Sequence, residues 1–163
     1  MPQSDASKYI NVSDAANCKT DGGVPIIASI VKIEDIEMAR EYINYIDCSM
    51  MKEKLTRAPE QEGLGWSMEM ADKVEVKYKK WLFLKRKYEN EIIPPTHDID
   101  AFWHAHILDT HAYFRDTAAI FGKYLHHYPY FGMRGKADEE KLTVAFENTR
   151  KLYQDEFGED ITD

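Results

Sequence analysis

Hydrophobic residues recur at steps of three or four along most of this 163-residue chain, which is the spacing of amphipathic α-helices. Helices are expected over residues 33–50, from 67 to the proline pair at 94–95, through 98–108, from 109 or 110 to 121, and from 138 to about 158. Polar residues at the expected starts are suited to cap them: Ser67, Thr96 or Asp98, Asp109 or Thr110, and Asp138. Gly122 is suited to end the helix that closes at Phe121.

This pattern predicts an all-α fold, a single-domain irregular helical bundle of about four to five helices. Residues 1–23 are polar and end in two glycines, so we expect a flexible N-terminal arm. The helical domain is expected over residues 24–158, with a short tail at 159–163. The apolar stretch at 24–31 fits either a short strand or a buried lead-in to the first helix, because Pro25 disfavours a central strand.

Composition narrows the classes of partner. The formal net charge of -8 disfavours binding to nucleic acid or anionic lipid, which takes most of its affinity from basic residues. The basic stretch KYKKWLFLKRK at 77–87 offers an anion-binding surface, but a solvated helix face balanced by acidic helices is the preferred interpretation. A small molecule or a peptide is the expected partner.

The expected location is cytoplasmic. No basic segment followed by an apolar run marks a signal peptide, and no apolar run approaches the ~20 residues that span a bilayer. The two cysteines, Cys18 and Cys48, lie far apart and form no CxxC pair, which fits a reduced compartment.

All six histidines fall between His97 and His127, inside or close to the stretch DIDAFWHAHILDTHAYF. At about 100° per residue, Asp100 and His104 lie one turn apart on one helix face, and His111 returns to that face if the helix is continuous. His106 points about 200° away from His104, so a regular helix does not bring both to one ion.

Three kinds of chemistry fit this cluster. Two histidines with a carboxylate suit a divalent transition metal such as Fe, Zn or Cu, and the candidate ligands are Asp100, His104, His106 and His111. His126 and His127 are possible additional ligands from an aromatic loop. The alternatives are metal-free acid–base catalysis and a structural polar network, since bulky apolar residues surround these groups and a buried polar group needs hydrogen-bond partners.

The run IIPPTHDIDAFWHAHILDTHAYFRD resembles the signature of the glycine-rich domain-containing protein-like family, with the pattern P..DxDxxWHxHxL....Y..D. The matching positions are Pro95, Asp98, Asp100, Trp103, His104, His106, Leu108, Tyr113 and Asp116. The likeness extends over roughly residues 64–131. It implies that Asp100, His104 and His106 belong to the family motif, whereas His111 does not, and it implies no particular reaction.

The motifs of several enzyme classes are missing, because the sequence has no GxGxxG, P-loop, HExxH or GxSxG pattern. The leading hypothesis is a small helical protein that binds a transition metal and acts as a metal-dependent enzyme, oxygenase-like or hydrolytic. The alternative is a non-catalytic interaction or pathway accessory module whose histidines and aspartates are structural.

Overall fold

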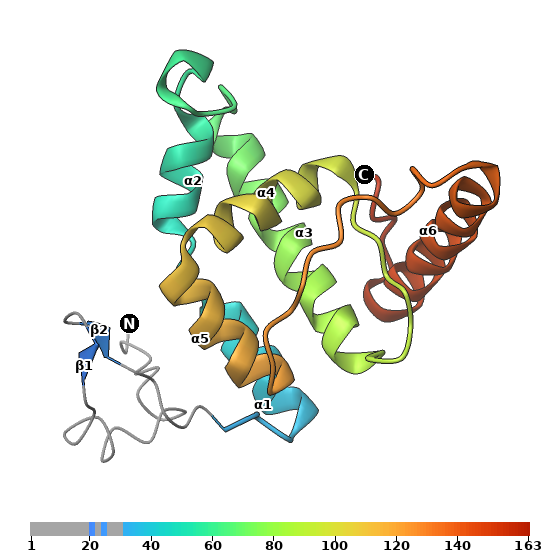
Figure 1. Ribbon diagram of the computed structural model, residues 1–163, viewed down its shortest axis with the longest axis horizontal. Coiled ribbons are helices and arrows are strands. Elements are labelled where there is room, and N and C mark those ends of the chain that lie inside the picture. Colours follow the sequence, from blue (N-terminus) through green and yellow to red (C-terminus); the bar gives the residue numbers. More distant parts are fainter. Residues whose placement is uncertain (1–19, 22–23, 26–30) are drawn as a thin grey trace.

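A computed structural model describes residues 20–21, 24–25 and 31–163, and this part of the chain is predominantly helical (Figure 1). Its helices are α1 (Ile36–Tyr45), α2 (Ser49–Thr56), the 3-10 turn η3 (Pro59–Gln61), α3 (Met68–Lys87), α4 (His97–Leu108), α5 (Thr110–Phe121) and α6 (Lys136–Phe157). Two short strands, β1 (Thr20–Asp21) and β2 (Val24–Pro25), pair antiparallel. The all-α prediction is confirmed. Most of the predicted arm and residues 26–30 of the lead-in lie outside the described residues.

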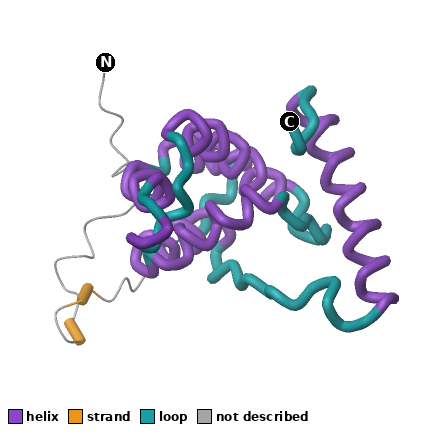
Figure 2. The backbone as a smooth tube through the Cα atoms, turned by 90° about the horizontal axis from the view of Figure 1, so that it is seen from above, coloured by secondary structure: helices purple, strands orange, loops and turns teal. Residues whose placement is uncertain are grey.

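Helix α3 is the centre of the bundle. It is buried on several faces, and α1, α2, α4 and α6 all pack against it (Figure 1). Figure 2 shows the helices as purple coils, with a teal loop leading to the long helix near the C-terminus. Helix α5 packs on α1 and α4. The connector, residues 122–135, leads from α5 to α6, whose principal helical neighbour is α3. The candidate site is built where this connector meets α4.

Three predicted helix boundaries depend on local capping, and all three are confirmed. The Ser67 hydroxyl accepts from the Met70 amide at 3.0 Å, and the Asp109 carboxylate accepts from the Ala112 amide at 3.2 Å. Gly122 ends α5 with a φ of 70°, a left-handed conformation that a residue without Cβ adopts at little cost.

Replacing Ser67 with alanine is expected to lower the free energy of unfolding by ~1 kcal/mol, because an amide at the start of α3 loses its acceptor. Urea denaturation followed by circular dichroism measures this change. Ser67→Asp is the matched control, since aspartate also caps a helix, and it should retain most of the stability. Equal losses in both variants would contradict the capping role.

The prediction of one helix over residues 33–50 is wrong. The structure breaks this segment at Ile46, so the described residues contain six α-helices rather than four to five. The cause is local: the Asp47 carboxylate accepts from the Ser49 amide at 2.9 Å, which starts α2 and competes with continuation of α1.

The final helix also begins differently from the prediction. Gly135, not Asp138, precedes its first residue. The Asp138 carboxylate instead accepts hydrogen bonds from the Gly132 amide at 2.7 Å and from the Arg134 guanidinium. Residues 159–163, expected as a tail, include the fully buried side chain of Ile161. Among the described residues, no helix is both long and apolar enough to cross a membrane.

Candidate metal centre

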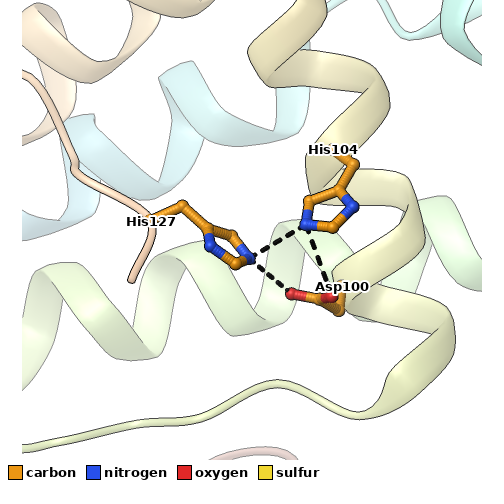
Figure 3. A group of neighbouring side chains, drawn as sticks. All are labelled: Asp100, His104 and His127. Atoms are coloured by element: carbon orange, nitrogen blue, oxygen red, sulfur yellow. Dashed lines mark hydrogen bonds and ion pairs between the residues drawn. The ribbon is translucent and has the colours of Figure 1, made fainter. Parts of the chain in front are cut away.

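Three ligand-type side chains meet at the surface of α4, and we call Asp100, His104 and His127 the trio (Figure 3). The His127 Nε2 atom lies 2.8 Å from Asp100 Oδ1 and 3.0 Å from His104 Nε2. The His104 Nε2 atom lies 3.5 Å from Asp100 Oδ2. Both imidazoles therefore direct the same nitrogen toward one carboxylate.

These separations match those of ligands around a single ion. Two nitrogen or oxygen donors held 2.0–2.1 Å from a metal are about 2.9–3.4 Å apart, depending on whether the geometry is octahedral or tetrahedral. The two Nε2 atoms are 3.0 Å apart, and each lies close to a different oxygen of Asp100, His127 at 2.8 Å from Oδ1 and His104 at 3.5 Å from Oδ2. The trio is thus close to a metal-binding geometry.

The exposure of the trio leaves room for further ligands. The side chains of His104, Asp100 and His127 are 54%, 30% and 16% exposed. Catalytic metal sites keep at least one coordination position for water or substrate, whereas structural sites are closed by protein ligands. With three protein donors on one side, this arrangement resembles the open kind.

Two different parts of the fold supply the trio. Asp100 and His104 are one turn apart on α4, as their spacing predicts, whereas His127 comes from the connector (Figure 3). The His127 ring packs on the Trp103 ring with centroids 4.4 Å apart. The Tyr113 hydroxyl donates to the Leu125 carbonyl, which fixes the connector two residues before His127.

His106 belongs to a separate, buried group. Its side chain is 1% exposed, and its Nε2 atom lies 3.1 Å from Asp116 Oδ2. Its Nδ1 atom lies 2.8 Å from the Tyr78 hydroxyl. Because an ionised carboxylate only accepts, His106 Nε2 carries the proton shared with Asp116, and Nδ1 pairs with the Tyr78 hydroxyl. The Asp116 carboxylate also accepts from Tyr42 at 2.7 Å and from Arg115 at 2.9 Å.

The electrostatics of this buried network favour an ionised Asp116. Burial by itself would raise the pKa of the Asp116 carboxyl, but hydrogen bonds from His106 and Arg115 outweigh it and hold that pKa below its usual range. Burial raises the pKa of the Tyr78 hydroxyl well above its usual value, so it remains a neutral donor. We call Tyr42, Tyr78, His106 and Asp116 the buried network.

The other predicted ligands do not join the trio. His111 is exposed on α5, because the break at Asp109 ends the continuous helix that would have returned it to the face of His104. His126 is exposed, with its ring 5.0 Å from that of Tyr124. The structure therefore brings together Asp100, His104 and His127, and leaves His106, His111 and His126 elsewhere.

A pocket of about 430 Å³ opens beside the trio, and Asp100 and His127 form part of its wall. This volume lies in the range of small-molecule sites. The rest of the wall is mainly apolar and aromatic: Ile92, Ile93, Pro94, Pro95, Trp103, Tyr128, Pro129, Phe131 and Leu142. Lys85, Thr96, His97 and His126 add polar groups.

The cysteine of the described region offers no nucleophile. Cys48 is 2% exposed, and burial raises the pKa of its thiol to about 12. Since the thiolate is the reactive form, this side chain acts as a small core residue. Cys18 lies outside the described residues.

Taken together, the fold and site define an all-α domain with a buried histidine–aspartate network and a separate surface trio. Residues 67–116 match the sequence model of the glycine-rich domain-containing protein-like family. This match confirms the resemblance carried by the DxDxxWHxHxL motif.

Two similar proteins from Arabidopsis thaliana are also named as glycine-rich domain-containing proteins. Glycine-rich domain-containing protein 1 is 31% identical over 86 residues, and glycine-rich domain-containing protein 2 is 33% identical over 86 residues. Each alignment covers 50% of this chain but only 10% and 11% of the two relatives. No solved structure matched the chain.

The motif residues divide between the two groups of side chains. Asp100 and His104 belong to the trio, while His106 and Asp116 belong to the buried network. His127 lies outside the matched segment of 67–116. Sequence reasoning missed the pairing of His106 with Asp116 and Tyr78, although Asp116 stood in the motif as a signal.

Proposed function

We propose that Asp100, His104 and His127 bind a divalent transition metal ion, and that the protein is a metal-dependent enzyme acting on a small molecule in the adjoining pocket. The observation that carries this proposal is the convergence of one carboxylate and two imidazole nitrogens, with one ligand atom from each residue lying within 4.8 Å of the other two. A cation coordinated by all three residues compensates the negative charge of the Asp100 carboxylate.

The donor set favours particular metals and reactions. Two histidines and one carboxylate with open positions suit Fe(II), and the same ligands suit Zn(II) or Cu(II). A metal held there supplies a Lewis acid and open positions for water, dioxygen or substrate, which covers both oxygenase-like and hydrolytic chemistry. The protein contributes the three ligands and an apolar pocket that holds the substrate beside them.

An interaction or accessory module with structural histidines is the second candidate, and the buried network favours it. His106 is fully buried and satisfied by Tyr78 and Asp116, as that hypothesis requires. His104 differs, because a side chain that is 54% exposed contributes little to a core. The two histidines therefore serve different purposes under the proposed function.

Metal analysis tests the proposal. Protein purified without chelators or added metal is expected to contain close to one transition metal ion per chain, as measured by inductively coupled plasma mass spectrometry. Titration of the metal-free protein with Zn(II), Fe(II) under argon, or Cu(II) should give one site. Absence of both stoichiometric metal and any thermal stabilisation on adding metal would contradict the proposal.

Substitution of the ligands gives the second arm of this test. His104→Ala and His127→Ala are each expected to weaken metal binding by more than ~100-fold, because loss of a ligand exceeds the effect of losing a ligand's hydrogen-bond partner. His111→Ala is the matched control, since it removes an exposed histidine outside the trio. If the histidines are structural, His104→Ala instead costs ~1–3 kcal/mol of stability without changing metal affinity.

A further inference from the structure

Lys85 is the exception among the basic residues of the stretch at 77–87. The other five basic side chains pair with carboxylates: Lys77 with Asp98, Lys79 with Glu75, Lys80 with Glu159, Arg86 with Glu89, and Lys87 with Glu156. Within the described part of the chain, the Lys85 ammonium has no hydrogen bond and no ion pair with another residue. Its nearest charge-stabilising contact is the Trp81 ring, 5.2 Å from Nζ to the centroid.

This lone ammonium faces the pocket beside the trio. Lys85 is part of the pocket wall together with Asp100 and His127. Burial lowers the pKa of Lys85 to about 8, so the amine is still mainly protonated at pH 7. A partly buried cation without a counter-charge favours an anionic group that arrives with a ligand.

The wall of the pocket limits what that ligand is. A single ammonium, with no arginine in the lining, matches one carboxylate better than a multiply charged phosphate chain, which takes several donors. The remaining surface is formed by prolines, Ile92 and the rings of Trp103, Tyr128 and Phe131. Such a surface fits an apolar or aromatic body.

We propose that this pocket binds a small monocarboxylic acid with an apolar or aromatic body, and that its carboxylate pairs with the Lys85 ammonium. With its carboxylate at Lys85, the apolar body of the ligand lies against the aromatic and proline-rich wall that also contains Asp100 and His127. The inference rests on the proposed function in that the bound molecule lies beside the metal, but the contact with Lys85 is tested separately.

Calorimetric titration of the purified chain with phenylacetate and with phenylacetamide tests this inference. The two probes share an apolar body and differ in charge, so the acid is expected to bind at least about tenfold more tightly. Lys85→Met keeps the apolar stem and removes the charge, and it should abolish this preference. Lys85→Arg should retain it in part, and circular dichroism checks that both variants are folded.

Each outcome bears on the inference. Absence of phenylacetate binding up to about 20 mM, where even a millimolar Kd is measurable, would overturn it. So would an unchanged preference in Lys85→Met. Loss of the preference in His104→Ala but not in Lys85→Met would place the carboxylate at the metal and also overturn it. A Lys85-dependent preference in a protein that binds no metal would sustain the inference while the proposed function fails.

Discussion

Replacing Asp116 with alanine is expected to lower the free energy of unfolding by about 3–5 kcal/mol, because it removes the centre of the buried network. Its side chain is 2% exposed and accepts from His106, Tyr42 and Arg115. Alanine leaves the buried N–H of His106 without its acceptor and removes one acceptor of the Tyr42 hydroxyl, so buried polar groups bear the cost of desolvation.

Equilibrium urea denaturation measures this loss. Asp155→Ala is the matched control, since this aspartate is exposed on α6, and it should change stability by no more than ~0.5 kcal/mol. The metal affinity that we propose for the trio should be close to that of the wild type while the variant is folded. An Asp116→Ala variant as stable as the control would show that the network contributes little.

The same carboxylate predicts how stability depends on pH. Its pKa is lowered in the folded protein, so its contribution is fully present above the unfolded pKa of ~3.9. That contribution is lost as pH falls through the folded pKa, because the unfolded chain then binds the proton more readily. Unfolding free energies measured below about pH 4 should therefore fall more steeply for the wild type than for Asp116→Ala.

Replacing Trp103 with alanine is expected to cost about 3–5 kcal/mol, the range for truncating a large buried aromatic side chain. Trp103 is 5% exposed and packs on Trp81 with ring centroids 4.8 Å apart. Its indole N–H donates to the Tyr113 hydroxyl at 2.9 Å. Because its ring also packs against His127, the substitution should weaken the metal binding that we propose for the trio as well as stability.

Trp103→Phe separates the contributions of the ring and the N–H group. Phenylalanine removes the N–H that donates to the Tyr113 hydroxyl but keeps much of the aromatic contact. The loss of unfolding free energy is therefore expected to be smaller than for alanine. Chemical denaturation and metal titration, both at a temperature where each variant is folded, give the two readings. Equal losses in the two variants would mean that ring packing at this position is unimportant.

The family motif therefore encodes a core as well as a candidate site. Its Trp103, His106, Tyr113 and Asp116 positions are buried and in mutual contact, which explains why so polar a segment lies inside a helical bundle. Asp100 and His104 occupy the solvent-facing side of the same helix. The same helix, α4, thus contributes buried residues that stabilise the fold and two of the three residues of the trio.

The sequence by itself determined the features that depend on neighbouring residues. Helical periodicity and the caps at Ser67, Asp109 and Gly122 act within one or two turns, so they are readable from local order. The rotation of about 100° per residue likewise placed His104 beside Asp100 and turned His106 to the opposite face.

Only the tertiary structure decided which distant groups complete each cluster. His127 reaches Asp100 from 27 residues away, and Tyr78 reaches His106 from 28 residues away. The path of the connector carries no periodic signal, and its position depends on contacts such as that of His127 with Trp103. The helices pack around α3 through many weak contacts between distant parts of the chain. These contacts bring His127 to Asp100 and Tyr78 to His106, and local sequence rules do not predict them.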